Sequence, residues 1–155
     1  MAEAEQANNQ ATVGMDKIYV KDMSLEIPHA PKIFMERENP QIHLQLQTQA
    51  AAIGEGVYEV IVMATVTAKV GEKVLFLIEV KQAGIFPVKN VPAENMDSVL
   101  AVMCPNILFP YLRETVSDVS VRAGFAPVLL SPINFEALYQ QQKQSQVKPP
   151  EETAH

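Results

Sequence analysis

The sequence contains one cysteine, no tryptophan and few positive charges. Its cysteine, Cys104, has no second cysteine with which to form an intrachain disulfide, which is typical of a reducing compartment. Lys and Arg total 12 against 18 Asp and Glu, so the formal net charge is -6. Because phosphate binding requires clustered Lys and Arg, this balance argues against nucleic acid as a ligand.

Long apolar runs are also absent. No stretch reaches the roughly 18 uninterrupted apolar residues that a bilayer-spanning helix requires. The first residues, MAEAEQANNQATVGM, have neither the basic part nor the apolar part of a secretory signal. A chain of 155 residues is enough for one ordinary domain. We therefore expect a single cytoplasmic domain without direct membrane insertion.

Patterns that indicate catalysis, metal binding or a cofactor are missing too. His29, His43 and His155 are far apart and have no partner at metal-ligand spacing. Cys104 lacks a CxxC partner and lies among apolar residues, which favours an inert buried thiol over a nucleophile. Neither GxGxxG nor GxxxxGK occurs. We expect no enzymatic activity, no metal and no cofactor.

The first half of the chain instead alternates apolar and polar residues in four segments, a pattern typical of strands with one buried face. Short connections between them predict an antiparallel sheet. After the third strand, a three-residue connection would pair Val70 with Val74, whereas a two-residue turn would pair Val70 with Lys73; we favour the former. The strands are predicted at 18–27, 41–48, 57–70 and 74–82. The polar face collects Asp22, Glu26, Glu59 and Glu79.

The second half repeats its apolar residues every three or four positions, which predicts a helix from Met96 to Val119. Gly124 is a natural stop for this helix. Pro105 and Pro110 lie within the pattern, and each is expected to begin or kink a helix because proline lacks the backbone N–H.

A second helix is predicted over 132–142, with Asn134 as its N-cap. The chain ends are polar and aperiodic, which predicts disordered tails at 1–16 and 143–155 around one domain at 17–142. Four strands and two helices leave many apolar connector residues competing for one small core. Each of these residues either packs inside or covers a partner.

Several segments closely resemble the SecB family of protein-export chaperones, and they follow one another in the family's order. They are IYVKDMSLEIPHAP (18–31), VYEVIVMATVTA (57–68), GIFPV (84–88), CPNILFPYLRETVSDVSVRAGF (104–125) and LSPINFEALY (130–139). The resemblance implies an α+β fold, in which a four-stranded antiparallel sheet carries a long helix on one face and a second helix follows near the C-terminus. It also implies a homotetramer built as a dimer of dimers.

The resemblance further implies a function in which no reaction is catalysed. Such a chaperone holds precursor proteins unfolded in the bacterial cytoplasm, does not hydrolyse ATP, and delivers its clients to the motor SecA. An oligomeric scaffold or a small acidic enzyme, each without a client groove, is the alternative. SecA-binding positions match Asp22, Glu26, Leu77 and Glu79, and positions sensitive for oligomer assembly match Ile78, Val80 and Gln82.

Loop hydrophobicity together with the family outline suggests where clients bind. The predicted client groove consists of Ile42, Leu44, Ile85, Phe86, Leu129, Leu130, Phe135 and Tyr139. On the second strand the sequence departs from the family pattern, because Gln45 and Gln47 stand where acidic residues are expected.

Overall fold

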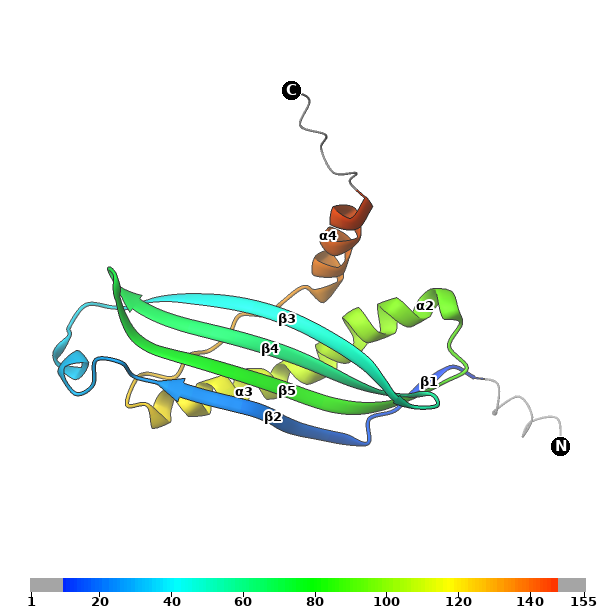
Figure 1. Ribbon diagram of the computed structural model, residues 1–155, viewed down its shortest axis with the longest axis horizontal. Helices are drawn as coiled ribbons and strands as arrows, with labels where there is room; N and C mark the ends of the chain where they lie inside the picture. Colours follow the sequence, from blue (N-terminus) through cyan, green and yellow to red (C-terminus); the bar gives the residue numbers. More distant parts are fainter. Residues whose placement is uncertain (1–9, 148–155) are drawn as a thin grey trace, which may run out of the picture.

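The computed structural model describes residues 10–147, which form a curled antiparallel sheet with a long helix along one face (Figure 1). This arrangement confirms the α+β fold predicted from the sequence. In chain order, the elements are β1 (Thr12–Val13), β2 (Lys17–Glu26), the 3-10 turn η1 (Lys32–Met35), β3 (Gln41–Gly54), β4 (Val57–Val70), β5 (Lys73–Lys89), α2 (Ala93–Ser98), the π-helical turn η2 (Val99–Met103), α3 (Cys104–Arg122) and α4 (Phe135–Val147).

The four predicted strands all occur, and every strand pair is antiparallel. β3, β4 and β5 follow one another as hairpins, while β2 pairs with the other edge of β5. The first long strand therefore lies beside the last one. β1 continues this edge, pairing Thr12 with Lys89 and Val13 with Val88.

The two chain ends differ from the predicted tails. β1 lies inside the predicted N-terminal tail, because the free edge of β5 offers backbone partners such as Pro87 O, which accepts from Gly14 N at 2.8 Å. At the other end α4 continues to Val147, past the predicted boundary at 142. The remaining parts of both predicted tails, 1–9 and 148–155, lie outside the described residues.

The β4–β5 hairpin corrects the predicted connection. Val70 pairs with Lys73, so the turn has two residues, and Gly71 adopts a φ of 58° that favours glycine. Further along, Ala68 pairs with Phe76, the register that the three-residue connection predicted. A β-bulge next to Lys69 reconciles the two registers by adding one residue to β5. Phe76, Ile78 and Val80 consequently face inward, whereas Val74 lies opposite Lys69 on the other face.

The core lies between the sheet and α3, which contacts β4 and β5. β4 contributes alternate residues to this core, since its inward side chains are small or β-branched and fully buried, whereas most of its outward ones are partly exposed. The helix contributes residues spaced three or four apart, so that one stripe meets the sheet. Fully buried members include Val60, Val62, Val66, Ile78, Val80, Leu108, Leu112 and Val116.

The predicted long helix occurs as α2, η2 and α3, which follow one another without a break. The π-helical turn η2 ends two residues before Pro105, which lies in the first turn of α3. Proline has no N–H, and its ring crowds the carbonyl four residues earlier, so a wider turn relieves both constraints. Pro110 lies exposed inside α3. Past the end of α3, Gly124 has a φ of 90°.

The second predicted helix, α4, begins where the sequence indicates. The backbone N–H of Ala137 donates to Oδ1 of Asn134 at 3.0 Å, so Asn134 is the N-cap. A buried edge-to-face contact between Phe135 and Phe109 of α3, with ring centroids 5.8 Å apart, joins the first turn of α4 to the long helix.

Candidate functional site

An apolar cleft of about 700 Å³ lies at the end of the molecule that carries η1. Its walls come from η1 and the loop after it, the start of β3, the start of β5, and the connector between α3 and α4. The exposed charged residues Glu36, Arg37 and Glu38 line one side. We call this space the apolar cleft.

Three phenylalanines form an aromatic wall in the apolar cleft. The Phe34 and Phe125 rings stack with centroids 5.3 Å apart, and Phe76 lies 4.8 Å from Phe125 in a tilted arrangement. Gly124 permits this packing, because a Cβ there would lie 3.0 Å from Cε1 of Phe34. The wall presents ring surface without fixed hydrogen-bond geometry, which suits varied apolar side chains.

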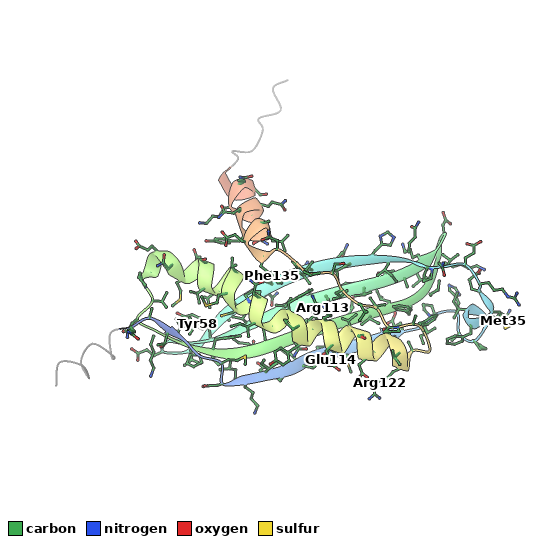
Figure 2. All side chains as sticks on the ribbon, turned by 180° about the vertical axis from the view of Figure 1, so that it is seen from behind. Met35, Tyr58, Arg113, Glu114, Arg122 and Phe135 are labelled. Atoms are coloured by element: carbon green, nitrogen blue, oxygen red, sulfur yellow. The ribbon has the colours of Figure 1, made fainter. Side chains whose placement is uncertain are left out.

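The connector that borders the apolar cleft is fastened to α3 by polar contacts. Nε of Arg113 donates to the Leu130 carbonyl at 2.8 Å, and the Arg113 guanidinium lies 5.0 Å from the centre of the Phe109 ring. The Val128 N–H donates to Oγ of the buried Ser120 at 2.9 Å. Figure 2 shows Arg113 on the long helix and Phe135 at the start of α4. These contacts hold one wall of the apolar cleft in place.

Four of the predicted groove residues line the apolar cleft, namely Ile42, Leu44, Leu129 and Leu130. Leu129 is 72% exposed, which is much for a leucine and leaves its side chain accessible to a ligand. The structure therefore brings together residues from β3 and from a connector more than 80 positions later in the chain.

The other four predicted groove residues lie elsewhere. Ile85 is on the outer face of the sheet, opposite Glu59, because its neighbour Phe86 points inward. Phe86 is fully buried and Phe135 nearly so; both belong to the core and do not line the cleft. Tyr139, on α4, lines a smaller cleft of about 400 Å³, and the Lys143 ammonium lies 4.6 Å above its ring.

Sequence reasoning missed the contribution of η1 and its following loop. Phe34 comes from PKIFMERENP, a stretch too short for helical periodicity and without strand alternation. A usable signal was the apolar IFM at 33–35, which stands between Pro31 and Pro40. The tertiary contact with Phe125 gives Phe34 its place in the cleft.

The predicted SecA-binding residues form one surface on the outer face of the sheet, away from α3. Glu26 on β2 lies directly opposite Leu77 on β5, and Asp22 lies opposite Lys81. Glu79 is between the two β5 positions and shares their face. We call Asp22, Glu26, Leu77 and Glu79 the acidic face. Asp22, Glu26 and Glu79 are exposed, so the negative charges meet solvent.

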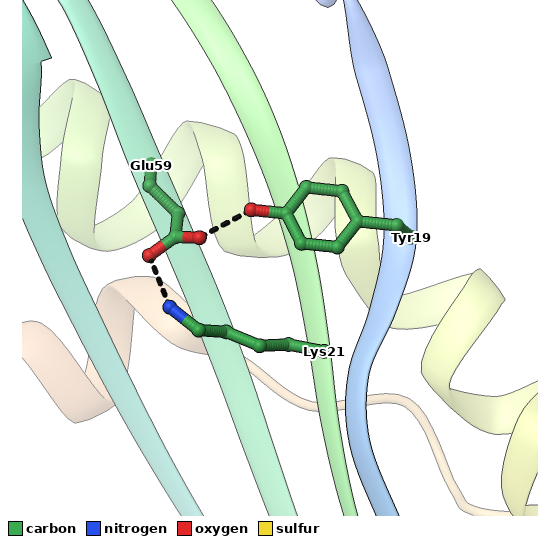
Figure 3. Close-up of polar contacts among 3 residues, drawn as sticks. All are labelled: Tyr19, Lys21 and Glu59. Atoms are coloured by element: carbon green, nitrogen blue, oxygen red, sulfur yellow. Dashed lines mark hydrogen bonds and ion pairs between the residues drawn. The ribbon is translucent and has the colours of Figure 1, made fainter.

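A hydrogen-bonded group on the same side of the sheet ties β2 to β4 across β5 (Figure 3). The Tyr19 hydroxyl donates to Oε2 of Glu59, and Nζ of Lys21 lies 2.8 Å from Oε1 of the same carboxylate. Hydrogen bonds from Lys21 and Tyr19 lower the pKa of Glu59, and the one from Lys21 has the larger effect. The hydrogen bond to Glu59, with some burial, raises the pKa of Tyr19 to about 12. At neutral pH Glu59 is therefore a carboxylate and Tyr19 a neutral phenol.

The predicted oligomer-interface residues face inward in the single chain. Ile78, Val80 and Gln82 are all buried beneath the long helix. The Gln82 amide is satisfied there, since its Oε1 accepts from Oγ1 of Thr115 at 3.1 Å and its Nε2 donates to the Tyr19 carbonyl at 3.3 Å. Almost none of the surface of these residues is exposed in the single chain.

Cys104 is a buried free thiol whose pKa is raised to about 11 by burial. A thiol in this state is mostly protonated at neutral pH and a poor nucleophile. His29 and His43 are exposed on different elements, whereas His155 lies outside the described residues. Within residues 10–147 no group of three or more His, Cys, Asp or Glu side chains is placed to hold a metal ion. In the same range no helix is both long enough and apolar enough to cross a membrane.

Comparison with known sequences identifies consistent relatives. The family model described as "Preprotein translocase subunit SecB" matches residues 6–146. A protein of Methylobacillus flagellatus named "Protein-export protein SecB" is 58% identical, and the match covers all of both chains. A protein of the same name from Nitrosomonas eutropha is 61% identical over 84% of this chain and 82% of its own.

Among solved structures, a SecB-like chaperone of Mycobacterium tuberculosis, determined in complex with a peptide from an antitoxin, has the same fold. The TM-score is 0.66, and the match covers 84% of this chain and 95% of the other. The sequence identity is 17%, so this similarity extends to the architecture alone.

Proposed function

The chain belongs to the SecB family of protein-export chaperones, and from this premise we propose that it holds precursor proteins unfolded in the bacterial cytoplasm and delivers them to SecA. In this proposal clients bind in the apolar cleft and SecA docks on the acidic face. The observation that carries the proposal is the separation of these two surfaces, since one is apolar and concave and the other is acidic and lies on the outer side of the sheet.

The apolar cleft has the chemistry that an unfolded client requires. An unfolded chain exposes apolar side chains that a folded protein buries, and an aromatic wall beside the exposed Leu129 can cover them without demanding one sequence. The similar solved chaperone was determined with a bound peptide, which is consistent with this use of the fold.

Client binding needs several such clefts on one scaffold. Covering ~1,000 Å² of apolar surface contributes a gross ~25 kcal/mol. Most of this is offset when the client is ordered and loses rigid-body freedom. Several weak contacts on one assembly therefore give a useful affinity, while each contact alone releases the client readily.

Leu129→Asp tests the client site. This exposed position tolerates a charge, but the carboxylate would have to be desolvated under a client, so we expect roughly tenfold weaker binding of a permanently unfolded polypeptide. Isothermal titration measures the affinity, and the folded form of the same polypeptide should not bind. Ile53→Asp, at an exposed position outside the cleft, is the matched control.

Equal affinity of both variants for the unfolded polypeptide would refute the cleft as the client site. A protein that binds neither the folded nor the unfolded form would instead be a scaffold, and turnover of a substrate would indicate an enzyme.

Glu79→Lys tests the acidic face. We expect SecA to bind this variant at least tenfold more weakly, because the substitution reverses a charge beside Asp22 and Glu26. Binding by the unaltered chain should also weaken as salt is raised, since exposed charges are screened. Glu72→Lys makes the same charge change at the exposed β4–β5 turn and serves as the control. If SecA binds Glu79→Lys and Glu72→Lys equally, docking is not on this face.

We further propose that four copies assemble as a dimer of dimers. The support is apolar surface that one chain leaves uncovered on the helix side of the sheet. Val20, Met23 and Leu25 line the inner face of β2, and all three are exposed. Tyr111 and Val121 are similarly exposed on α3. Covering these side chains gives assembly an apolar driving force.

A further inference from the structure

Lys21 is the extra residue of a β-bulge in β2. Val20 pairs with Gln82 and Asp22 pairs with Lys81, so the two partners on β5 are consecutive although Lys21 lies between the residues on β2. Such a bulge leaves one residue without an opposite neighbour and shifts the alternation of the strand by one.

The bulge decides which face of the sheet carries the acidic residues of β2. Tyr19 is on the outer face, and in a regular strand the residue three positions later, Asp22, would be on the inner face. Because Lys21 is the extra residue, Asp22 and Glu26 share the outer face with Tyr19, and Met23 faces inward. The acidic face therefore depends on this bulge.

The polar group in Figure 3 is placed to hold the bulge. The Lys21 side chain reaches across β5 to the Glu59 carboxylate, which also accepts from the neighbouring Tyr19. Apolar packing of the single chain holds this register weakly, because Val20 is 44% and Met23 51% exposed on the inner face. The group formed by Tyr19, Lys21 and Glu59 thus provides a specific anchor at the bulge.

We propose that Lys21 is a positioning residue for SecA docking, acting through its ion pair with Glu59 to keep Asp22 and Glu26 on the acidic face. This proposal rests on the docking site proposed above. The positioning role and a simple charge effect predict changes of SecA affinity in opposite directions when Lys21 is replaced. Removing the Lys21 cation makes the outer face more negative, and charge alone would then strengthen the attraction for a basic segment of SecA. Loss of positioning would instead weaken the binding of SecA.

The test is Lys21→Met in the full-length protein. We expect SecA affinity to fall roughly threefold to tenfold, with client affinity and assembly mass unchanged. Hydrogen exchange of the backbone amides around residues 20–25 should quicken, whereas that of β3 should not. Lys21→Arg keeps the cation and should restore both measurements.

Lys69→Met is the matched control, because it removes the same charge from the outer face of β4, away from the bulge at Lys21 in β2. It should leave SecA affinity unchanged or raise it. Should Lys21→Met fail to fold, Tyr19→Phe removes only the hydroxyl and is expected to weaken docking in the same direction.

SecA affinity of Lys21→Met equal to or above that of the unaltered chain would overturn the positioning role. If Glu79→Lys weakens docking while Lys21→Met does not, this inference alone fails. If Glu79→Lys also has no effect, the docking site itself is wrong, and the inference fails with it.

Discussion

At the scale of single residues, Glu59 shows how a surface carboxylate acquires a structural role. The sequence places it among the polar residues of a strand, where a solvated side chain is the ordinary expectation. The structure gives it two donors from β2, and these lower its pKa. Its charged form is therefore linked to the folded state.

Glu59→Gln should consequently change the acid stability of the protein. A lowered folded-state pKa contributes stability that is present above the ordinary value of 4.5 and is lost as pH falls through the folded-state pKa. We expect the unaltered chain to be the more stable at neutral pH and the difference to shrink below about pH 4.5. Urea denaturation at a series of pH values measures this. A difference that does not depend on pH would contradict the linkage.

At the scale of elements, the contact between β5 and α3 depends on one glycine. A Cβ on Gly84 would lie 2.8 Å from Cε2 of Phe86 and 2.9 Å from Cδ2 of Leu108, closer than such atoms approach in proteins. The helix can therefore approach the strand here only because the side chain is absent.

Gly84→Ala should destabilise the fold by about 1–3 kcal/mol, since both neighbours are fully buried and cannot move aside freely. Gly54→Ala is the control, because a Cβ there meets only Val57 at 4.0 Å. Chemical denaturation of the two variants provides the comparison. Equal stability would mean that α3 shifts without penalty.

At the scale of the whole molecule, the sheet separates two kinds of surface. The outer side carries the acidic face, while the helix side retains exposed apolar residues beyond the reach of α3. One chain of this size cannot cover all of its apolar surface with a single long helix. The proposed assembly would cover the helix side and leave the acidic face available to solvent.

Met23→Asp tests this arrangement. A carboxylate on the inner face of β2 would be desolvated by a second chain, so the mass of the assembly should fall below four chains. Met35→Asp makes the same substitution at an 82% exposed position on η1 and should keep the mass of the unaltered protein. Multi-angle light scattering reports the mass. If both variants and the unaltered chain have the same mass, the inner face of β2 does not form the interface.

The sequence by itself located the four long strands and the two main helices, because periodicity and capping are local properties. Two-residue alternation located four strands, three-to-four spacing located the long helix, and Asn134 marked the start of α4. The same alternation placed Asp22 and Glu79 together on the polar face.

Tertiary structure decided the remaining features, because these features depend on contacts between segments distant in the chain. The β-bulge in β5 allows a two-residue turn between β4 and β5. The bulge at Lys21 is held by Glu59 from another strand. Hydrophobicity alone did not separate Phe86, which the core encloses, from Leu129, which the cleft exposes, because both are apolar and only the path of the backbone distinguishes them.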